Sequence, residues 1–385
     1  MLEKQRPRRT TRAVKVGPLT IGGDAPVIVQ SMTKTDTRDV GATVAQIEQM
    51  VATGCELVRL AVPDQPAAVA LAEIARRLPQ VPLVADIHFQ YRLALAALDA
   101  GIAKLRLNPG NIGAPEKVRE VVRKAQACGV PIRIGVNAGS LERRLLEKYG
   151  YPTPEAMVES AFDHIRILEE LDFREIIVSL KASHVQLTVD AYRLLAPQVD
   201  YPFHLGITEA GSAFAGTLKS SVGLGMLLAE GIGDTIRVSL ATDPAEEVRV
   251  AYEILKALDI RARGLNVIAC PTCGRLEVDL FKMVEEIERH TAHIGESLNL
   301  AVMGCAVNGP GEARTAHLGV ACGRGNGVIY RDGIAVRRVA EDQIVPELVK
   351  ELESYVEQLR GSASAHRPER KTREQNAVAA GPTPR

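Results

Sequence analysis

The sequence predicts an α/β protein in which an N-terminal TIM (β/α)8 barrel is followed by a small α+β domain. Short β-branched runs alternate with amphipathic helical stretches through the first 265 residues, and this alternation indicates parallel strands joined by helical crossovers. Eight such runs fall within about 250 residues, the usual size of a TIM barrel. After Gly264 the alternation stops. A doubly wound open sheet is the competing architecture, but it usually has fewer strands and needs a glycine-rich first turn that is missing here.

The expected elements follow from this alternation. The eight barrel strands are expected at residues 26–33, 56–62, 82–88, 104–108, 131–137, 175–181, 203–209 and 234–240, with helical stretches such as 43–53, 91–100, 116–128 and 154–171 between them. The second domain is expected to hold strands at 266–269 and 298–303, short strands near 317–320 and 327–330, and helices over 276–292 and 340–359. We therefore expect an N-terminal arm (1–15, loose and basic over 1–12), a barrel (16–262), an α+β domain (263–360) and a disordered tail (361–385).

The bulk composition excludes several classes of protein. Lys plus Arg and Asp plus Glu are both 47, so the chain lacks the basic field that a broad nucleic-acid or anionic-membrane surface needs. The N-terminus has no apolar signal region, and no apolar run is long enough to span a membrane. The six cysteines are expected to be thiols or metal ligands in a reducing cytoplasm.

Polar residues gather at the carboxyl ends of the expected strands, where barrel enzymes place their active sites. In strand order they are Arg59, Asp86, His88, Arg106, Asn108, Arg133, Asn137, Lys181, Glu209, Arg237 and Ser239. A barrel interior is ordinarily aliphatic, so four arginines and a lysine converging there predict an anionic ligand. Arginine suits phosphate because its planar fork donates two parallel hydrogen bonds. Two basic clusters suggest more than one phosphoryl group, whereas each cation alone also fits a solvated rim charge.

Two further features are expected at this mouth. The segment 217–221, with Lys219 and Ser220, is expected to open the helix after the seventh strand and to offer free backbone N–H groups to an anion. Asp86, His88 and Glu209 are candidates for acid–base chemistry. The alternative for each of them is an ordinary ion-pair partner among the surrounding cations.

The cysteines after residue 264 form a metal-binding pattern. Cys270 and Cys273 are spaced CxxC, and Cys305 opens a segment that ends at Glu312. Structural zinc prefers four Cys or His ligands, whereas three thiolates on a [4Fe–4S] cluster leave one iron for a carboxylate or a substrate. The Asn-Gly-Pro-Gly turn at 308–311 is expected to bring Glu312 toward Cys305. Iron–sulfur is favoured and zinc stays open.

The other three cysteines carry no such pattern. Cys55 and Cys128 are expected to be small core residues. Cys322 is ambiguous, because it is the one further thiol that could serve as a fourth ligand.

Five motifs together resemble a known family, the 4-hydroxy-3-methylbut-2-enyl diphosphate synthases of the short bacterial form, over residues 8–360. They are Val29-Gln-Ser-Met-Thr33, Gly206-Ile-Thr-Glu-Ala-Gly211, Lys219-Ser-Ser, Cys270-Pro-Thr-Cys273 and Cys305-Ala-Val-Asn-Gly-Pro-Gly-Glu312. The resemblance implies an oxidoreductase of the non-mevalonate isoprenoid pathway that opens 2-C-methyl-D-erythritol 2,4-cyclodiphosphate with two electrons and loss of water.

The resemblance also implies a role for each candidate residue. A [4Fe–4S] cluster would be held by Cys270, Cys273, Cys305 and Glu312. Glu312 would yield its iron to the substrate, while Glu209 would protonate the departing hydroxyl. The family's diphosphate-binding positions fall on Arg106, Asn108, Arg133, Asn137, Lys181, Arg237 and Ser239. Flavodoxin or ferredoxin would donate the electrons, and a head-to-tail homodimer would cover each barrel mouth with the partner's cluster domain.

Two other functions fit parts of the pattern. A pterin- or phosphate-handling barrel synthase with a structural zinc domain would be colourless and would tolerate loss of Glu312. An iron–sulfur sensor of a phosphorylated metabolite would bind a cluster without turnover, and it gives no reason for Glu209 at the mouth. Both need several independent features to agree by accident.

Overall fold

The computed structural model describes residues 7–365. The chain divides into two compact units, with the division between Ala262 and Arg263.

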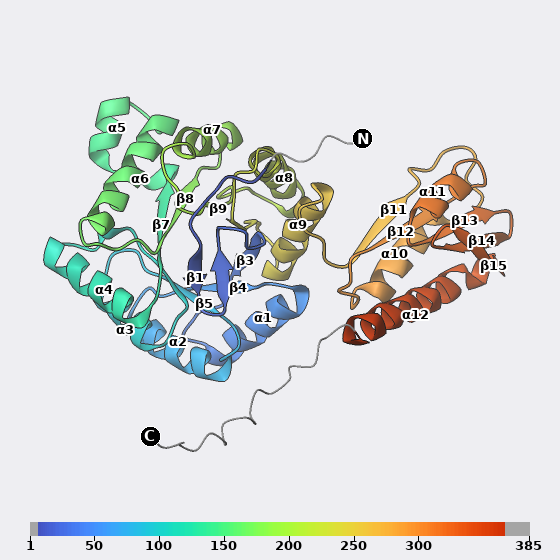
Figure 1. The fold of residues 1–385 in the computed structure, drawn as a ribbon, viewed down its shortest axis with the longest axis horizontal. Helices are drawn as coiled ribbons and strands as arrows, with labels where there is room; N and C mark the ends of the chain where they lie inside the picture. The colour runs from blue at the N-terminus through green and yellow to red at the C-terminus, as the bar shows by residue number, and fades with distance from the viewer. Residues whose placement is uncertain (1–6, 366–385) are drawn as a thin grey trace, which may run out of the picture. The chain divides into compact units, whose positions relative to one another are not determined.

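The first unit is a parallel eight-stranded barrel (Figure 1). Its strands are β3 (Ile28–Met32), β4 (Leu57–Ala61), β5 (Leu83–Asp86), β6 (Lys104–Arg106), β7 (Ile132–Asn137), β8 (Ile176–Lys181), β9 (His204–Leu205) and β10 (Thr235–Ile236). The sheet order is β8-β7-β6-β5-β4-β3-β10-β9, and a parallel bridge between Val178 and Phe203 joins its two ends. The predicted TIM barrel is confirmed, and each observed strand lies within its expected range.

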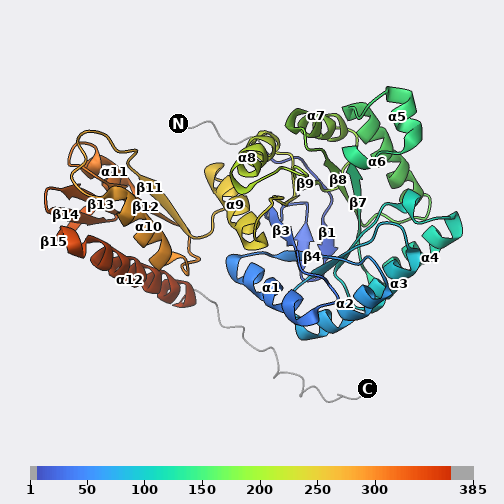
Figure 2. The ribbon, with the colours of Figure 1, turned by 180° about the vertical axis from the view of Figure 1, so that it is seen from behind.

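Helices surround the strands in both ribbon views (Figures 1 and 2). They are α1 (Val40–Thr53), α2 (Gln65–Arg77), α3 (Tyr91–Asp99), η1 (Pro109–Asn111), α4 (Pro115–Cys128), η2 (Ala138–Ser140), α5 (Arg143–Tyr149), α6 (Pro154–Glu169), α7 (Val185–Leu195), α8 (Ala213–Ala229) and α9 (Pro244–Ala257). Local chemistry sets several of these ends. Asp39 and Asp64 accept hydrogen bonds from the first turns of α1 and α2. Gly54 ends α1 in the left-handed conformation that glycine adopts without steric cost.

A β-hairpin closes the amino-terminal end of the barrel. Its strands β1 (Val14–Val16) and β2 (Leu19–Ile21) pair antiparallel. The inward side chains Val14, Val16 and Ile21 pack against Ile28, Leu57, Val84 and Ile177, which lie near the starts of four barrel strands. The aliphatic plug leaves the carboxyl end as the polar end of the barrel.

The chain before this hairpin is bound to the barrel, so the expected loose arm is wrong for residues 7–12. Arg8 donates to Asp234 and to two backbone carbonyls. The Arg9 guanidinium lies 4.0 Å from the Phe203 ring centroid and donates to the carbonyls of Ala196, Val199 and Tyr201. The basic residues of the arm satisfy backbone groups, a use that composition does not reveal.

The second unit is a five-stranded sheet in the order β11-β12-β13-β14-β15. Its strands are β11 (Leu265–Ala269), β12 (Leu298–Met303), β13 (Leu318–Gly323), β14 (Asn326–Arg331) and β15 (Ile334–Ala340). The first three are parallel and the last two pair antiparallel. Helices α10 (Leu280–Thr291) and α12 (Ile344–Ala365) pack on one face, and α11 (Gly309–Thr315) packs on the other.

Three expectations for this unit need correction. Strand β15 is absent from the predicted elements. The helix expected from residue 276 begins at Leu280, after a short turn, and is capped by Asp279. Helix α12, which is preceded by η3 (Glu341–Gln343), runs on to Ala365, so residues 361–365 belong to a helix and not to the expected tail. Residues 366–385 lie outside the described part of the chain.

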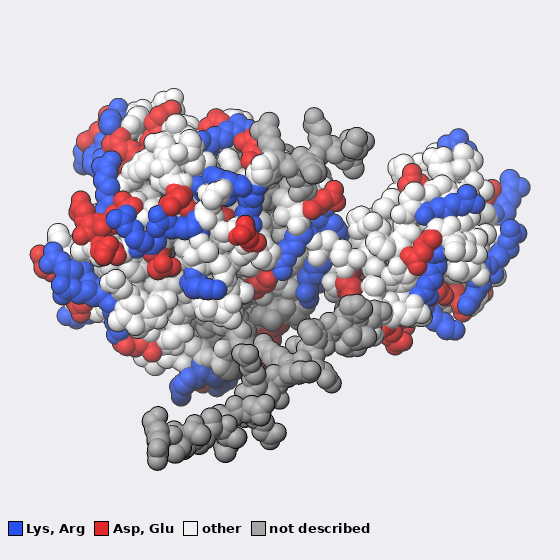
Figure 3. Space-filling model, in the orientation of Figure 1, with Lys and Arg blue, Asp and Glu red and all other residues white. Residues whose placement is uncertain are grey.

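The surface carries charges of both signs. Basic and acidic side chains are interspersed over the face of the barrel shown in Figure 3, as the balanced composition suggests. None of the described helices combines the length and apolar character needed to cross a membrane.

Replacing Arg9 tests whether the arm stabilises the barrel. Arg9→Ala removes the contact with Phe203 and leaves three carbonyls without their donor. We expect the free energy of unfolding to fall by about 2 kcal/mol in urea titrations. Arg12→Ala is the matched control, because Arg12 forms an exposed ion pair with Asp200 and lies 4.7 Å from the Tyr201 ring centroid, surface contacts that we expect to contribute about 1 kcal/mol. Equal effects of the two variants would contradict this account.

Candidate active site

The carboxyl end of the barrel is lined with buried or nearly buried cations. Arg106, Arg133 and Lys181 are at most 5% exposed, and the side chains of Arg59 and Arg237 are 12% and 13% exposed. Burial, together with Arg59 and other cations nearby, lowers the pKa of Arg106, Arg133 and Lys181. The structure therefore brings the predicted basic residues of five strands together, in a desolvated interior that favours an anion.

Asp86 forms ion pairs with one group of these cations. Its carboxylate lies 3.8 Å from Arg59 Nε, 3.4 Å from Arg106 Nη1 and 3.5 Å from His88 Nε2. Burial alone would raise the pKa of Asp86, but Arg59, the hydrogen bond with His88 and Arg106 together hold that pKa far below its usual range. Asp86 therefore lies as a counter-ion among these cations, which is the ion-pair arrangement that the sequence left open for it.

A glycine on β7 makes room for two arginines, and sequence reasoning did not identify it. A side chain at Gly135 would lie 2.9 Å from Arg106 Nε and 3.2 Å from Arg133 Nη1. The Gly135 carbonyl accepts from Arg106 and Asn108, and its N–H donates to Asn108 Oδ1. Asn108 thus uses its amide to fix the β7 backbone. A glycine inside a strand pattern is the signal that could have indicated this close approach.

Deeper in the barrel lie polar groups that were not predicted. Lys104 donates to Gln30 over 3.1 Å, and Lys181 Nζ lies 3.2 Å from His204 Nε2. Burial lowers the pKa of Lys104, and burial with Lys181 nearby lowers the pKa of His204. A side chain at Gly206 would lie only 2.6 Å from Lys181 Nζ. Polar residues at inward-facing strand positions could have revealed this group.

Arg237 directly follows β10, the last strand of the barrel, and lies close to a carboxylate that sequence reasoning also missed. Glu247, at the start of α9, is 1% exposed and lies 3.7 Å from Arg237 Nη2. Asn137 ends β7 and Ser239 follows β10, and both are half-buried.

Glu209 lies in the loop after β9 and is exposed. Its φ angle is 52°, in the left-handed region that non-glycine residues rarely occupy. The neighbouring Thr208 N–H donates to Ala182 O after β8. The backbone thus holds the carboxylate at the mouth in a strained conformation, a situation frequent at functional sites.

The expected helix start at residues 217–221 is wrong. Helix α8 begins at Ala213, with Ser212 at its N-cap position, so Lys219 and Ser220 are its seventh and eighth residues. Backbone N–H groups there are used within the helix and are not free for an anion. Lys219 is exposed, whereas Ser220 is fully buried.

In the second unit, the cysteines lie at one edge of the sheet. Cys270 follows β11 and Cys305 follows β12, and these strands run parallel with Ala269 opposite Val302. Thr272, inside the CxxC turn, has a φ of 63°. Cys273 is exposed, and its hydrogen bonds with Arg275 lower the pKa of its thiol. Thiolate is the form that binds metal.

The segment before Glu312 is helical and does not form the expected turn. Residues Gly309–Thr315 form α11, and Glu312 is exposed in its first turn. Three thiols on the loops after β11 and β12 and a carboxylate in the first turn of α11 are a donor set of the kind that iron–sulfur clusters use. Among the described residues, no group of three or more His, Cys, Asp or Glu side chains is placed to hold a metal ion.

The remaining cysteines divide differently from the prediction. Cys55 is buried as expected, and burial raises the pKa of its thiol to about 12. Cys128 is exposed, so its expected core position is wrong. Cys322 on β13 is buried in the aliphatic core, and burial raises its pKa to about 12.

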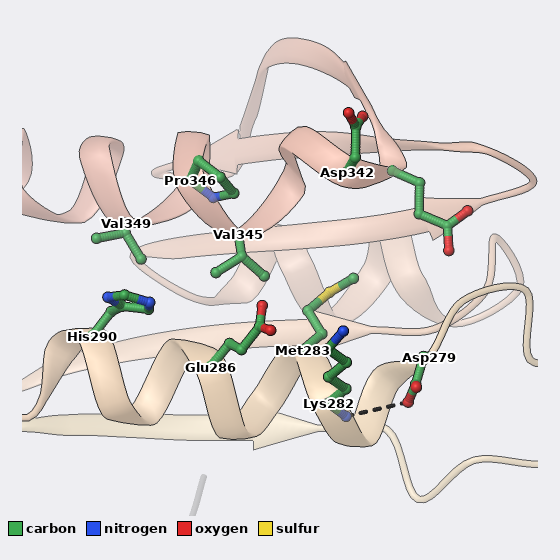
Figure 4. A pocket seen from close by; sticks show the side chains of 10 residues that line it. Asp279, Lys282, Met283, Glu286, His290, Asp342, Val345, Pro346 and Val349 are labelled. Atoms are coloured by element: carbon green, nitrogen blue, oxygen red, sulfur yellow. Dashed lines mark hydrogen bonds between the residues drawn. The ribbon is translucent and has the colours of Figure 1, made fainter.

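A groove in the second unit lies apart from these candidates. It is bounded by α10 and the start of α12, and Figure 4 shows Met283 and Glu286 facing Val345 across it. No cysteine lines it. Its lining mixes acidic, basic and aliphatic side chains, which gives no reason to place the predicted chemistry there.

Comparisons with known proteins agree with this division. The model of the GcpE TIM-barrel domain matches residues 11–252, and that of the GcpE protein C-terminal domain matches residues 266–354. The chain belongs to the GcpE family. The resemblance described above is thereby confirmed, and membership of this family implies an iron–sulfur enzyme.

Similar proteins extend the match over nearly the whole chain. Proteins named 4-hydroxy-3-methylbut-2-en-1-yl diphosphate synthase (flavodoxin) are 59% identical in Geobacillus kaustophilus, covering 91% of this chain and 94% of the relative, and 54% identical in Bacillus subtilis, covering 96% and 98%. Among solved structures, the dihydropteroate synthase of Thermus thermophilus has a TM-score of 0.48 at 15% identity, covering 64% of this chain and 99% of the other.

Replacing Asp86 tests its role as a counter-ion. Asp86→Asn leaves Arg59 and Arg106 without a carboxylate, and we expect the free energy of unfolding to fall by about 3 kcal/mol at neutral pH. Because the pKa of Asp86 is lowered in the folded state, its stabilisation is present above the unfolded value of about 4 and is lost as pH falls. In urea titrations, the difference between variant and wild type should be constant from about pH 5 to 7 and shrink below about pH 4. A difference that grows on acidification would contradict the assignment.

Proposed function

We propose that this GcpE-family chain is a 4-hydroxy-3-methylbut-2-enyl diphosphate synthase. It would convert 2-C-methyl-D-erythritol 2,4-cyclodiphosphate to (E)-4-hydroxy-3-methylbut-2-enyl diphosphate and water. The observation that carries the proposal is the buried cationic barrel mouth, in a chain at least 54% identical over at least 90% of its length to relatives of that name. The zinc-bearing barrel synthase is not favoured, because these relatives match both units.

The barrel mouth suits a cyclic diphosphate. We propose that the substrate is bound by Arg59, His88, Arg106, Asn108, Arg133, Asn137, Lys181, Arg237 and Ser239, with Asp86 orienting two of the arginines. Lys219 and Ser220 remain proposed contacts through their side chains. Cations that are already fixed and desolvated stabilise phosphoryl charge without reorganising at the moment of reaction.

The cysteine edge suits a [4Fe–4S] cluster held by Cys270, Cys273, Cys305 and Glu312. Such a cluster, when bound, supplies low-potential electrons one at a time. We propose that reduced flavodoxin or ferredoxin is the electron donor, since the relatives' names specify flavodoxin. We further propose that the enzyme is a cytoplasmic head-to-tail homodimer.

Glu209 is the proposed proton donor. The reaction takes up two electrons and two protons, breaks one carbon–oxygen bond of the ring, and releases a hydroxyl as water. A leaving hydroxyl needs a proton, and a positioned carboxylic acid typically contributes about 10²–10⁴-fold to such a transfer. Glu209 lies at the barrel mouth, and its loop is hydrogen-bonded to the loop after β8.

Metal analysis tests the cluster. Anaerobically reconstituted protein should hold about four irons per chain with broad brown absorbance. Cys305→Ser should lower the iron content and the absorbance, because it removes one proposed ligand. Cys128→Ser is the control, since this thiol is exposed at the end of α4 in the other unit. One zinc per chain without colour would sink the cluster and the reductase assignment together.

Turnover tests Glu209. Glu209→Gln should lower kcat with reduced flavodoxin at least about 100-fold while leaving KM within a few-fold, because it removes a proton and not a charge contact. Glu209→Gly should be equally slow without loss of melting temperature, since glycine adopts the positive φ found there. Full turnover by either variant would rule out the proton role.

A further inference from the structure

We propose that Glu247 is a positioning residue that fixes Arg237 and the loop after β3 for binding of a diphosphate. The inference rests on the proposed function in taking the barrel mouth as a diphosphate site. Glu247 belongs to none of the motifs that identify the family, and it lies on α9, outside the strand ends that usually carry barrel chemistry.

Glu247 bridges a gap where the first and last barrel strands meet. The pairing of β3 with β10 covers only two positions, Ile28 with Thr235 and Val29 with Ile236. Beyond them, toward the mouth, the Glu247 carboxylate accepts from Ser31 Oγ over 2.6 Å and from Leu240 N over 3.0 Å. Ser31 belongs to β3 and Leu240 follows β10. The Glu247 carboxylate thus connects the ends of β3 and β10 beyond the point where their backbone pairing stops.

The same carboxylate faces two cations. Lys34 Nζ lies 3.1 Å from Oε1, and Arg237 Nη2 lies 3.7 Å from Oε2. Lys34 also donates to the carbonyls of Leu240 and Thr242, so it ties the loop after β3 to the loop after β10. Its donors are occupied, which leaves Arg237 as the cation that Glu247 presents to a ligand.

The mouth therefore has two carboxylates with parallel roles. Among the described residues, the buried carboxylates are Asp86, Asp234 and Glu247. Asp234 lies at the opposite end, where it accepts from Arg8 and from Phe203 N. Asp86 orders Arg59 and Arg106, and Glu247 orders Arg237. Two separately anchored cation groups match a ligand with two phosphoryl groups, and removal of one anchor should weaken the binding of one of them.

Glu247→Gln isolates the charge. The amide oxygen still accepts from Leu240 N, and the amide N–H₂ can donate to Ser31 Oγ. The side chain at position 247 therefore keeps a hydrogen bond to each of these two residues. Glu246→Gln is the matched control, because the Glu246 side chain lies on the same turn, is 44% exposed and pairs with Arg249. Circular dichroism and melting temperature establish that each variant is folded. Binding of the cyclic diphosphate is measured by calorimetry without reductant, and turnover is measured separately with reduced flavodoxin.

We expect Glu247→Gln to weaken binding of the cyclic diphosphate about tenfold and to change kcat less than about threefold. Glu246→Gln should bind and turn over the cyclic diphosphate like the wild type. Arg237→Gln should weaken binding more strongly. Adding Glu247→Gln to Arg237→Gln should then change binding by less than about twofold, because a residue that acts through another loses its effect in that background.

The outcomes separate this inference from the proposed function. Wild-type affinity in Glu247→Gln, or effects of the two substitutions that multiply, would overturn the positioning role. Binding that weakens as expected, in a protein that never turns the ligand over, would leave the positioning role standing and refute the proposed reaction. A loss confined to kcat would also overturn the inference, since an anchor of a binding cation acts on affinity.

Discussion

Burial of cations inside the barrel is the constraint on which the rest of the structure depends. Lys104, Arg106, Arg133 and Lys181 are at most 5% exposed, while only Asp86 and Glu247 supply buried carboxylates at the mouth among the described residues. Removing a charge from water costs several kcal/mol even after relaxation, so an aliphatic interior would be the more stable choice. Burial of these cations lowers both the stability of the fold and the pKa of each cation. A bound anion would stabilise the buried charges, which explains why a functional site keeps them.

The surrounding structure offsets this cost with space and with rigidity. Gly135 and Gly206 have no side chains, which leaves room for two guanidinium groups and an ammonium group at places where a Cβ atom would lie only 2.6–3.2 Å from them. The Tyr192 hydroxyl accepts from Leu180 N and donates to His204 O, fixing β8 and β9 beside Lys181. The hairpin and Arg9 close the opposite end. Contacts at the amino-terminal end of the barrel and between its strands thus offset the destabilisation at the mouth. Strain at functional sites is commonly tolerated in this way.

Strand positions and the identity of most mouth residues could be predicted, because alternation and the carboxyl-end rule are local patterns. Elements that depend on tertiary contacts could not. Residues 217–221 look like a helix start because of their hydroxyls, but α8 already begins at Ala213, without a side-chain capping hydrogen bond. β15 holds exposed Ile334 and Val336 beside two arginines, which is no clear alternation. Glu247 acts from a helix, and only the fold shows that it reaches both Ser31 and Leu240.

The loop that carries Glu209 combines close packing around glycines with a strained backbone conformation. Gly206 leaves space for Lys181, and Gly211 has a φ of 114° that a side chain would oppose. Between them, Thr208 N donates to Ala182 O and Gly211 O accepts from Ala241 N, so the loops after β8 and β10 tie the segment from both sides. The left-handed Glu209 costs about 1–3 kcal/mol, which these neighbours must supply. A freely moving carboxylate among so many cations would pair with one of them, as Asp86 does. The strained, tethered backbone fixes the place of Glu209, and its side chain is exposed.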